Sequence, residues 1–258
     1  MEFFEKIEKL VDDLSWNIPE QKRGKIGVIG GSKGMFRWVV KTAEFASAKY
    51  PMKEVKMVVP ESLKGVLPEL PYVEFIGATK SGTLGDEKAL GEAVSRLDYN
   101  LMIGDLSKNA ETGQVLAKIL AEVEVPTLIT RDTVDLVVET GVEGILMNEK
   151  IVILASLVQV QKLLRSVFYP KMLTLSQSLM QVVEILHKFT LSYPVKIVTL
   201  HNGQILVADG GVVKAVPIEK TEFSPMTLWS GELAAKIGAL NLYNPGNFVG
   251  ATLTAILG

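Results

Sequence analysis

A glycine-rich turn near the amino terminus has the composition of an anion-binding loop. The run Gly-Gly-Ser-Lys-Gly at positions 30–34 follows an apolar segment, residues 26–29, and precedes a helix-forming stretch, residues 36–50. A strand that enters such a turn before a helix directs backbone N–H groups toward a phosphate or carboxylate. Glycine is also needed for a tight turn that binds nothing. Ligand binding and a structural role are therefore both open for the turn, and Lys33 is either a phosphate ligand or a solvated side chain.

Two acidic residues follow later apolar segments and could act on a ligand. Asp105 comes after residues 100–103, and Asp132 comes after residues 126–130. Ligands of open α/β sheets bind at the carboxyl ends of parallel strands, where either aspartate could orient a ligand hydroxyl. Aspartate is also a common cap and turn residue. Capping is the favoured role for Asp105, and both roles are open for Asp132.

Composition limits the classes of function. The chain has 258 residues, 48% of them apolar and 22% charged, a net charge of −2 and no cysteine. The charge argues against a nucleic-acid partner, and the missing cysteines exclude disulfides and thiolate chemistry. The two histidines have no clustered acids at ligand spacing, so we expect no metal site. An acidic amino terminus and the lack of a long apolar run predict a soluble, cytoplasmic protein without a membrane partner.

The elements that must position these residues alternate between strands and helices. Apolar runs predict parallel strands over residues 26–29, 55–59, 73–76, 100–103, 126–130 and 151–154. Helical spacing predicts helices over residues 36–50, 61–67, 86–97, 112–122, 157–168 and 174–189. This alternation is typical of βαβ units, whose strand ends near Gly30, Gly104 and Thr130 would share one edge of the sheet.

The two ends of the chain follow different patterns. Residues 195–200, 204–208 and 212–216 predict strands joined by Asn202-Gly203 and Gly210-Gly211, which are hairpin signals, so we expect an antiparallel edge there. Helices are expected over residues 228–240 and 249–257. At the other end, apolar residues at helical spacing predict an amphipathic helix over residues 1–18. No linker or repeat divides the chain, so we expect one domain over residues 1–258.

Four segments, taken in order, carry a resemblance to one enzyme family. They read Gly-Val-Ile-Gly-Gly-Ser-Lys-Gly-Met (27–35), Val-Val-Pro-Glu-Ser-Leu (58–63), Met-Ile-Gly-Asp-Leu (102–106) and Pro-Thr-Leu-Ile-Thr-Arg-Asp-Thr-Val-Asp-Leu (126–136). Their order and spacing resemble those of the ADP/ATP-dependent NAD(P)H-hydrate dehydratases, a branch of the ribokinase-like superfamily. The resemblance implies a three-layer αβα sandwich with a mostly parallel central sheet and an antiparallel edge near residues 195–216.

The later motifs of that family are eroded in this chain. Residues 153–159 lack the family's Thr-Pro-His-Pro-Gly-Glu segment. Its Gly-Gly-Thr-Gly-Asp motif, which binds nucleotide phosphates and supplies the catalytic base, has two registers here. The preferred register uses Ser230 and Gly231 for the nucleotide and Glu232 as the base. The alternative register places Asn247 at the position of the base, although an amide has no basic form.

The resemblance implies the remaining roles. It gives substrate contacts to residues of the early turn and of two strand ends: Gly30, Gly31, Ser32, Gly34, Gly104 and Asp132. ADP or ATP, with Mg²⁺, would drive dehydration of hydrated NADH or NADPH, at reduced activity, in a chain that forms a homo-oligomer. Two alternatives remain. One is an inactive ribokinase-fold homologue that serves binding or assembly, and a weaker one is a small-molecule kinase.

Overall fold

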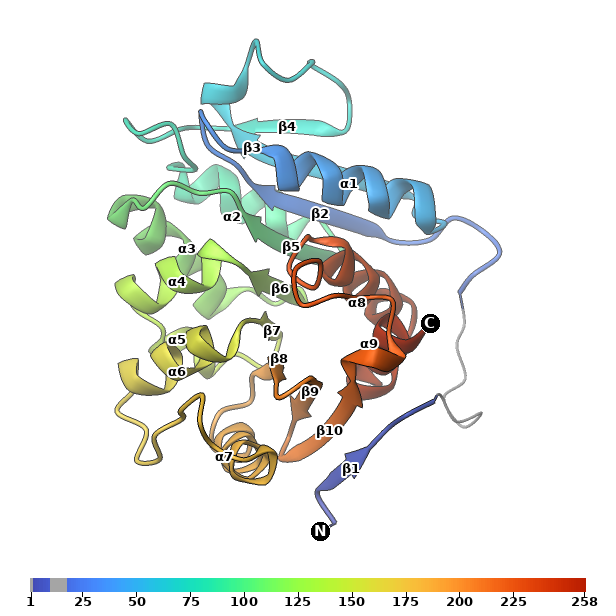
Figure 1. The fold of residues 1–258 in the computed structure, drawn as a ribbon. Helices are drawn as coiled ribbons and strands as arrows, with labels where there is room; N and C mark the ends of the chain where they lie inside the picture. The colour runs from blue at the N-terminus through green and yellow to red at the C-terminus, as the bar shows by residue number, and fades with distance from the viewer. Residues whose placement is uncertain (1, 10–17) are drawn as a thin grey trace.

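A ten-stranded sheet runs through the part of the chain that the computed structural model describes, residues 2–9 and 18–258 (Figure 1). The strand order is β1-β10-β9-β8-β7-β6-β5-β2-β3-β4. The strands are Phe4–Lys6 (β1), Lys25–Gly30 (β2), Glu54–Pro60 (β3), Val73–Ile76 (β4), Tyr99–Gly104 (β5), Thr127–Thr130 (β6), Ile151–Leu154 (β7), Lys196–His201 (β8), Gln204–Asp209 (β9) and Val212–Pro217 (β10). Strands β2 to β8 pair in parallel, and β8, β9 and β10 pair antiparallel. This confirms the predicted mostly parallel sheet and its antiparallel part.

Helices cover both faces of the sheet (Figure 1). Helices α1, α8 and α9 lie on one face, and α2 to α7 lie on the other. Side chains of neighbouring strand residues alternate between the two faces, so Val28 belongs to one apolar core and Ile29 to the other. The helices are Arg37–Lys49 (α1), Glu87–Ser95 (α2), Ala110–Glu122 (α3), Asp132–Thr140 (α4), Glu143–Leu146 (α5), Leu157–Ser166 (α6), Leu179–Ser192 (α7), Glu232–Tyr243 (α8) and Phe248–Leu257 (α9).

Most predicted elements are present, and several of them differ at their ends. Helix α7 begins at residue 179 rather than 174, and α8 begins at residue 232 rather than 228. The short helix expected over residues 61–67 is a single 3-10 turn, Glu61–Leu63. Helices α4 and α5 follow β6 in a region where no helix ranges were predicted from the sequence.

The amphipathic helix predicted over residues 1–18 is wrong for the residues that the structure describes there. Residues Phe4–Lys6 form β1, which pairs in parallel with β10. The amide of Val213 donates to the carbonyl of Phe3, and the amide of Ile7 donates to Ala215, each at 2.8 Å. Pairing with the open edge of β10 satisfies backbone groups on both strands, and this outweighs a weak helical periodicity. Residues 10–17 of the prediction lie outside the described residues.

Close packing places α8 over the centre of the sheet. A Cβ atom at Gly238, in the middle of α8, would lie 2.8 Å from Leu101 of β5. The missing side chain therefore lets the helix approach the strand closely. Strand β5 ends at Gly104, so α8 is held near the strand ends where a ligand is expected.

Candidate functional site at the carboxyl edge of the sheet

Glycines join the carboxyl ends of β2 and β5 without room for a side chain. The amide of Gly31 donates to the carbonyl of Gly104 at 2.8 Å. Gly30 and Gly104 have φ angles of 147° and 92°, a region that favours glycine. A Cβ atom at Gly30 would collide with the carbonyl oxygen of Gly104. The backbone geometry thus requires glycine at both positions, whether or not a ligand binds.

The rest of the early turn is less constrained. Ser32 is buried, and its amide donates to the carbonyl of Met35 at 2.6 Å. Gly34 is exposed, and a side chain there would meet open space. Lys33 is exposed as well. Substrate contact through this turn stays a prediction for Ser32 and Gly34.

Asp132 closes the turn that follows β5. Its two carboxylate oxygens accept the amides of Asp105 at 3.0 Å and Leu106 at 2.7 Å. Burial raises the pKa of this carboxyl group, while those amide donors and the neighbouring Arg131 act in the opposite direction. Each oxygen of Asp132, which was predicted to contact substrate, therefore already accepts one backbone amide of its own chain.

Asp105 and Arg131 form an ion pair across the strand ends. The Asp105 carboxylate, only 4% exposed, accepts the Trp38 amide at 2.7 Å and the Arg131 guanidinium at 3.2 Å. The same guanidinium donates to the carbonyl of Trp229 at 3.4 Å and lies 5.1 Å from the Trp38 ring. Arg131 thereby links the ends of β5 and β6 to the turn before α8.

The amino terminus of α8 begins without a side-chain cap among the described residues. Its N-cap is Gly231, with a φ of 95°, and within the described chain no side chain caps the helix. The first amides of such a helix lack intrahelical partners and carry the positive end of the helix dipole. Glu232, the predicted base, is the first helical residue and is exposed. The exposed carboxylate and the uncapped amides are therefore adjacent.

Buried polar atoms without partners gather around this terminus. The Thr42 hydroxyl has no hydrogen-bond partner among the described residues, although Thr42 is only 1% exposed. It lies where a Cβ atom of Gly231 would collide with it. The buried Oγ of Ser230 and the buried Nε of Arg131 also lack a hydrogen-bond partner among the described residues. Buried polar groups normally have partners, yet these three atoms are unsatisfied within the described residues at the start of α8.

The alternative register for the base lies elsewhere. Asn247 is the N-cap of α9, and its side chain accepts the amide of Gly250 at 3.0 Å. It follows the carboxyl end of α8, whose twelve residues span about 18 Å at 1.5 Å per residue. The structure therefore places Glu232 near the strand ends and gives Asn247 a capping role.

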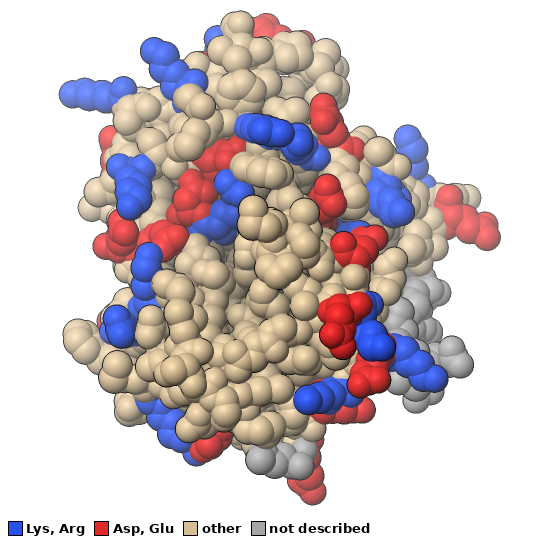
Figure 2. All heavy atoms as spheres, in the orientation of Figure 1, with Lys and Arg blue, Asp and Glu red and all other residues tan. Residues whose placement is uncertain are grey.

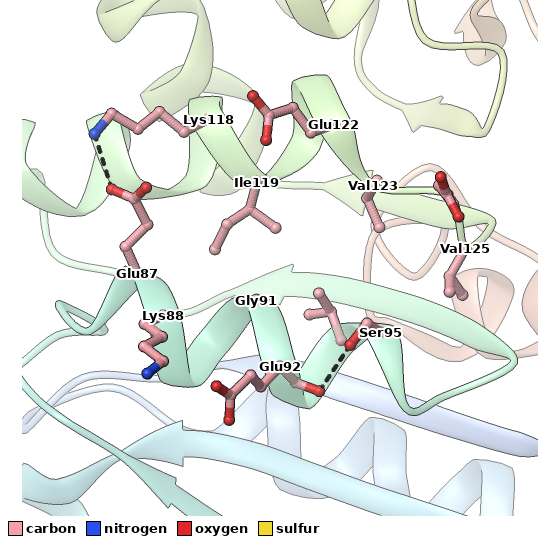
Figure 3. Close-up of a pocket in the computed structure, with 12 residues that line it drawn as sticks. Glu87, Lys88, Gly91, Glu92, Ser95, Lys118, Ile119, Glu122, Val123 and Val125 are labelled. Carbon is pink, nitrogen blue, oxygen red and sulfur yellow. Dashed lines mark hydrogen bonds and ion pairs between the residues drawn. The ribbon is translucent and has the colours of Figure 1, made fainter.

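The described cavities lie beside or away from this site. A cavity of about 130 Å³ is lined by Ser107, Asp132, Asp135 and Lys162, among others. A larger groove of about 670 Å³ runs between α2 and α3, where Ile119 points into it and Glu87 pairs with Lys118 at 2.9 Å (Figure 3). This groove extends to the carboxyl ends of those helices, away from the strand ends.

Residues that could hold a metal do not converge in the structure. Among the described residues, no group of three or more His, Asp or Glu side chains is placed to bind a metal ion. The Asp105 and Asp132 carboxylates at the strand ends are bonded to Arg131 and to backbone amides. No helix of the described residues is long and apolar enough to cross a membrane.

Arg131 and Thr42 are the site residues that sequence reasoning missed. Thr42 lies inside α1 among other polar residues such as Lys41 and Glu44, so its residue type gives no signal. Arg131 directly precedes Asp132, so its place after a predicted strand was a usable signal. Its interactions with Asp105 and Trp229 join residues that are 26 and 98 positions apart.

The sheet order and the layered helices define a ribokinase-like α/β fold, and known structures support this. A ribokinase-like superfamily protein from Enterococcus faecalis matches with a TM-score of 0.69 and 16% identity, over 100% of this chain and 87% of its own. A hypothetical protein from Streptococcus mutans matches with a TM-score of 0.66 and 12% identity, over 96% and 88%.

One structural neighbour has the activity that the resemblance implies. The ADP/ATP-dependent NAD(P)H-hydrate dehydratase from Bacillus subtilis, co-crystallised with ATP and Mg²⁺, has a TM-score of 0.59 and 12% identity, over 95% of this chain and 83% of its own. No family model and no curated protein matches the sequence. At these identities the likeness establishes the fold alone.

Proposed function

We propose that this protein binds the phosphates of ADP or ATP at the amino terminus of α8 and dehydrates hydrated NADH or NADPH at a reduced rate. The observation that carries the proposal is the uncapped start of α8 at Gly231, packed against the unpartnered Thr42 hydroxyl. Free backbone amides and the helix dipole at a helix start favour the binding of phosphate. The neighbour that was co-crystallised with ATP and Mg²⁺ has the same fold, which supports the choice of nucleotide.

The proposed chemistry needs positioning and one base. The hydroxyl oxygen of the hydrated ring attacks the terminal phosphorus, the shorter nucleotide leaves, and Glu232 accepts the hydroxyl proton. The phosphate then departs with the C–O electron pair, a ring proton is lost, and the ring double bond is restored. Glu232 is exposed at the first position of α8, so it can face a bound substrate.

Two features account for a reduced rate. Glutamate is one methylene longer than the aspartate of the family, and a misplacement of about 1 Å can cost roughly a hundredfold. The turn before α8 also has fewer donors for phosphate. The amides of Leu228 and Ser230 donate to the carbonyls of Ser224 and Thr227, each at 3.0 Å.

The test follows recovery of the reduced-nicotinamide absorbance when hydrated NADH is incubated with ADP or ATP. Glu232→Gln should lower the rate by about 10²- to 10⁴-fold, the usual contribution of a general base, and should leave ATP affinity largely unchanged. The matched control is Glu111→Gln, which changes an exposed first-turn glutamate of α3. Equal rates for the two variants would contradict a catalytic role for Glu232.

A second candidate, an inactive protein for binding or assembly, is favoured by an apolar surface. Phe168, Met172 and Leu175, in the connection between α6 and α7, are 91%, 62% and 62% exposed. Figure 2 shows an area with few charged side chains in the lower centre of the view, bordered by charged side chains at its margins. Such a surface fits a homo-oligomer. If the absorbance does not recover and no adenine nucleotide causes a thermal shift, the result would favour this candidate over the enzyme.

A further inference from the structure

The Arg131 guanidinium has unused hydrogen-bonding capacity at the start of α8. An arginine has five N–H donors in a planar fork. Arg131 uses one on Asp105 at 3.2 Å and one on the Trp229 carbonyl at a long 3.4 Å. Its Nε is buried and without a partner among the described residues, and its side chain is 24% exposed. The remaining donors on its two terminal nitrogens can therefore serve a ligand, whereas the buried Nε does not reach one.

The backbone of Arg131 is held in an uncommon conformation. Its φ is 58° and its ψ −137°, a combination that residues with a Cβ atom rarely adopt. The Gln159 side chain donates to the Arg131 carbonyl at 2.7 Å and to the Asp135 carboxylate at 2.7 Å. Since Gln159 also belongs to the capping box of α6, the start of that helix fixes the arginine's position.

An aromatic platform holds the head of the arginine near other cations. The guanidinium lies 5.1 Å from the centre of the Trp38 ring, and Arg37 and Lys41 lie 5.7 and 5.6 Å from the same ring. One carboxylate, Asp105, pairs with Arg131. A planar, weakly hydrated cation on an aromatic face is pre-organised to bind phosphate through two parallel hydrogen bonds.

We propose that Arg131 binds the terminal phosphate of a nucleoside di- or triphosphate whose phosphates lie at the start of α8. This rests on the nucleotide site proposed above and adds a specificity residue to it. Trp229, which Arg131 contacts, precedes the N-cap Gly231 by two residues, so the guanidinium lies close to the start of α8. The long bond to the Trp229 carbonyl is exchanged for phosphate oxygens, and the bond to Asp105 is kept. The buried, unpartnered Thr42 hydroxyl, which also supports the nucleotide site, lies beside Gly231 at the same helix start.

Calorimetric titration of purified full-length protein with ATP, AMP and inorganic tripolyphosphate tests this. Arg131→Gln should lower the affinity for ATP and for tripolyphosphate about 10- to 100-fold, as expected for lost hydrogen bonds to a charged group. The affinity for AMP should stay nearly unchanged. Arg131→Lys should restore part of the loss, because it keeps the charge without the fork. The control Arg37→Gln removes an exposed cation from the same ring without the link to Trp229.

The outcomes separate this proposal from the dehydratase activity. If Arg131→Gln lowers the affinity for ATP and for AMP equally, the residue is merely structural and the proposal is overturned. An unchanged ATP affinity in this variant would overturn the proposal as well. Thermal unfolding of each variant without ligand checks that it is folded. A wild-type protein that binds neither ATP nor tripolyphosphate overturns both the nucleotide site and the role of Arg131. A wild-type protein that binds ATP through Arg131 but repairs no hydrated NADH overturns the dehydratase function alone.

Discussion

At the end of β5, Gly104 is a residue whose missing side chain leaves room for a carboxylate. Its φ is 92°, and a Cβ atom there would collide with Oδ1 of Asp132. That carboxylate holds the amides of Asp105 and Leu106. The geometry of the whole turn, including the ion pair with Arg131, therefore depends on one glycine.

Gly104→Ala should destabilise the protein by about 2–4 kcal/mol, because it strains the backbone and displaces a buried, hydrogen-bonded carboxylate. Chemical denaturation gives the free energy of unfolding. The control is Gly34→Ala, at an exposed position with open space around it, which should change stability by less than about 0.5 kcal/mol. Similar losses for the two variants would contradict this account of Gly104.

The roles of the two site aspartates could be predicted only in part. A capping role was favoured for Asp105, and its carboxylate does accept an amide of a first helical turn. That amide belongs to Trp38 of α1, 67 positions away, so local sequence could not reveal which helix it serves. Asp132 likewise bonds to amides 26 and 27 positions away. Residue type predicted the kind of interaction, and only the fold could supply the partner.

At the scale of elements, strands were easier to predict than helix ends. A buried strand has a compact apolar signature, whereas a helix end depends on its cap. Ser178 and Gln181 form a capping box that starts α7 at Leu179, so the Ser-x-x-Gln pattern was a usable signal for that boundary. Helix α8 starts with Gly231, which offers no side-chain cap and hence no signal. The weak signal and the proposed anion site have the same cause, an uncapped helix start.

Helix α7 also carries an ion-pair cluster that makes stability depend on pH. Glu184 accepts hydrogen bonds from Lys188 at 2.8 Å and Lys171 at 2.9 Å, which lower its pKa from 4.5 to about 2. A carboxyl group with a lowered pKa in the folded state stabilises the protein above its unfolded pKa. This contribution is lost as the pH falls from 4.5 toward 2.

Glu184→Gln should therefore make the free energy of unfolding fall less steeply in that acidic range than it does in the wild type. Urea denaturation at a series of pH values measures both slopes. Added salt should reduce the difference, because the three side chains are exposed. Identical slopes at low salt would show that the cluster does not couple protonation to folding.

At the scale of the whole molecule, the order of apolar segments predicted the sheet, and the amino-terminal strand escaped prediction. The βαβ alternation determines strand direction, so β2 to β8 could be anticipated from one sequence. β1 pairs with β10, more than 200 positions away, and no local pattern encodes so distant a partner. The ribokinase-like fold was thus predictable, whereas the closure of its antiparallel edge by the start of the chain was not.

The pairing of β1 with β10 should depend on the buried side chain of Ile7. Ile7 is buried next to the last residue of β1, and its amide donates to Ala215. Ile7→Ala should free β1 from β10, because loss of a buried aliphatic side chain costs about 2–5 kcal/mol and the strand has only three residues. Hydrogen exchange of the Val213 amide, which donates to the Phe3 carbonyl, should then speed up by about 10- to 100-fold. The exposed neighbour Glu8→Ala is the control, and unchanged protection of Val213 in Ile7→Ala would show that Ile7 does not anchor the strand.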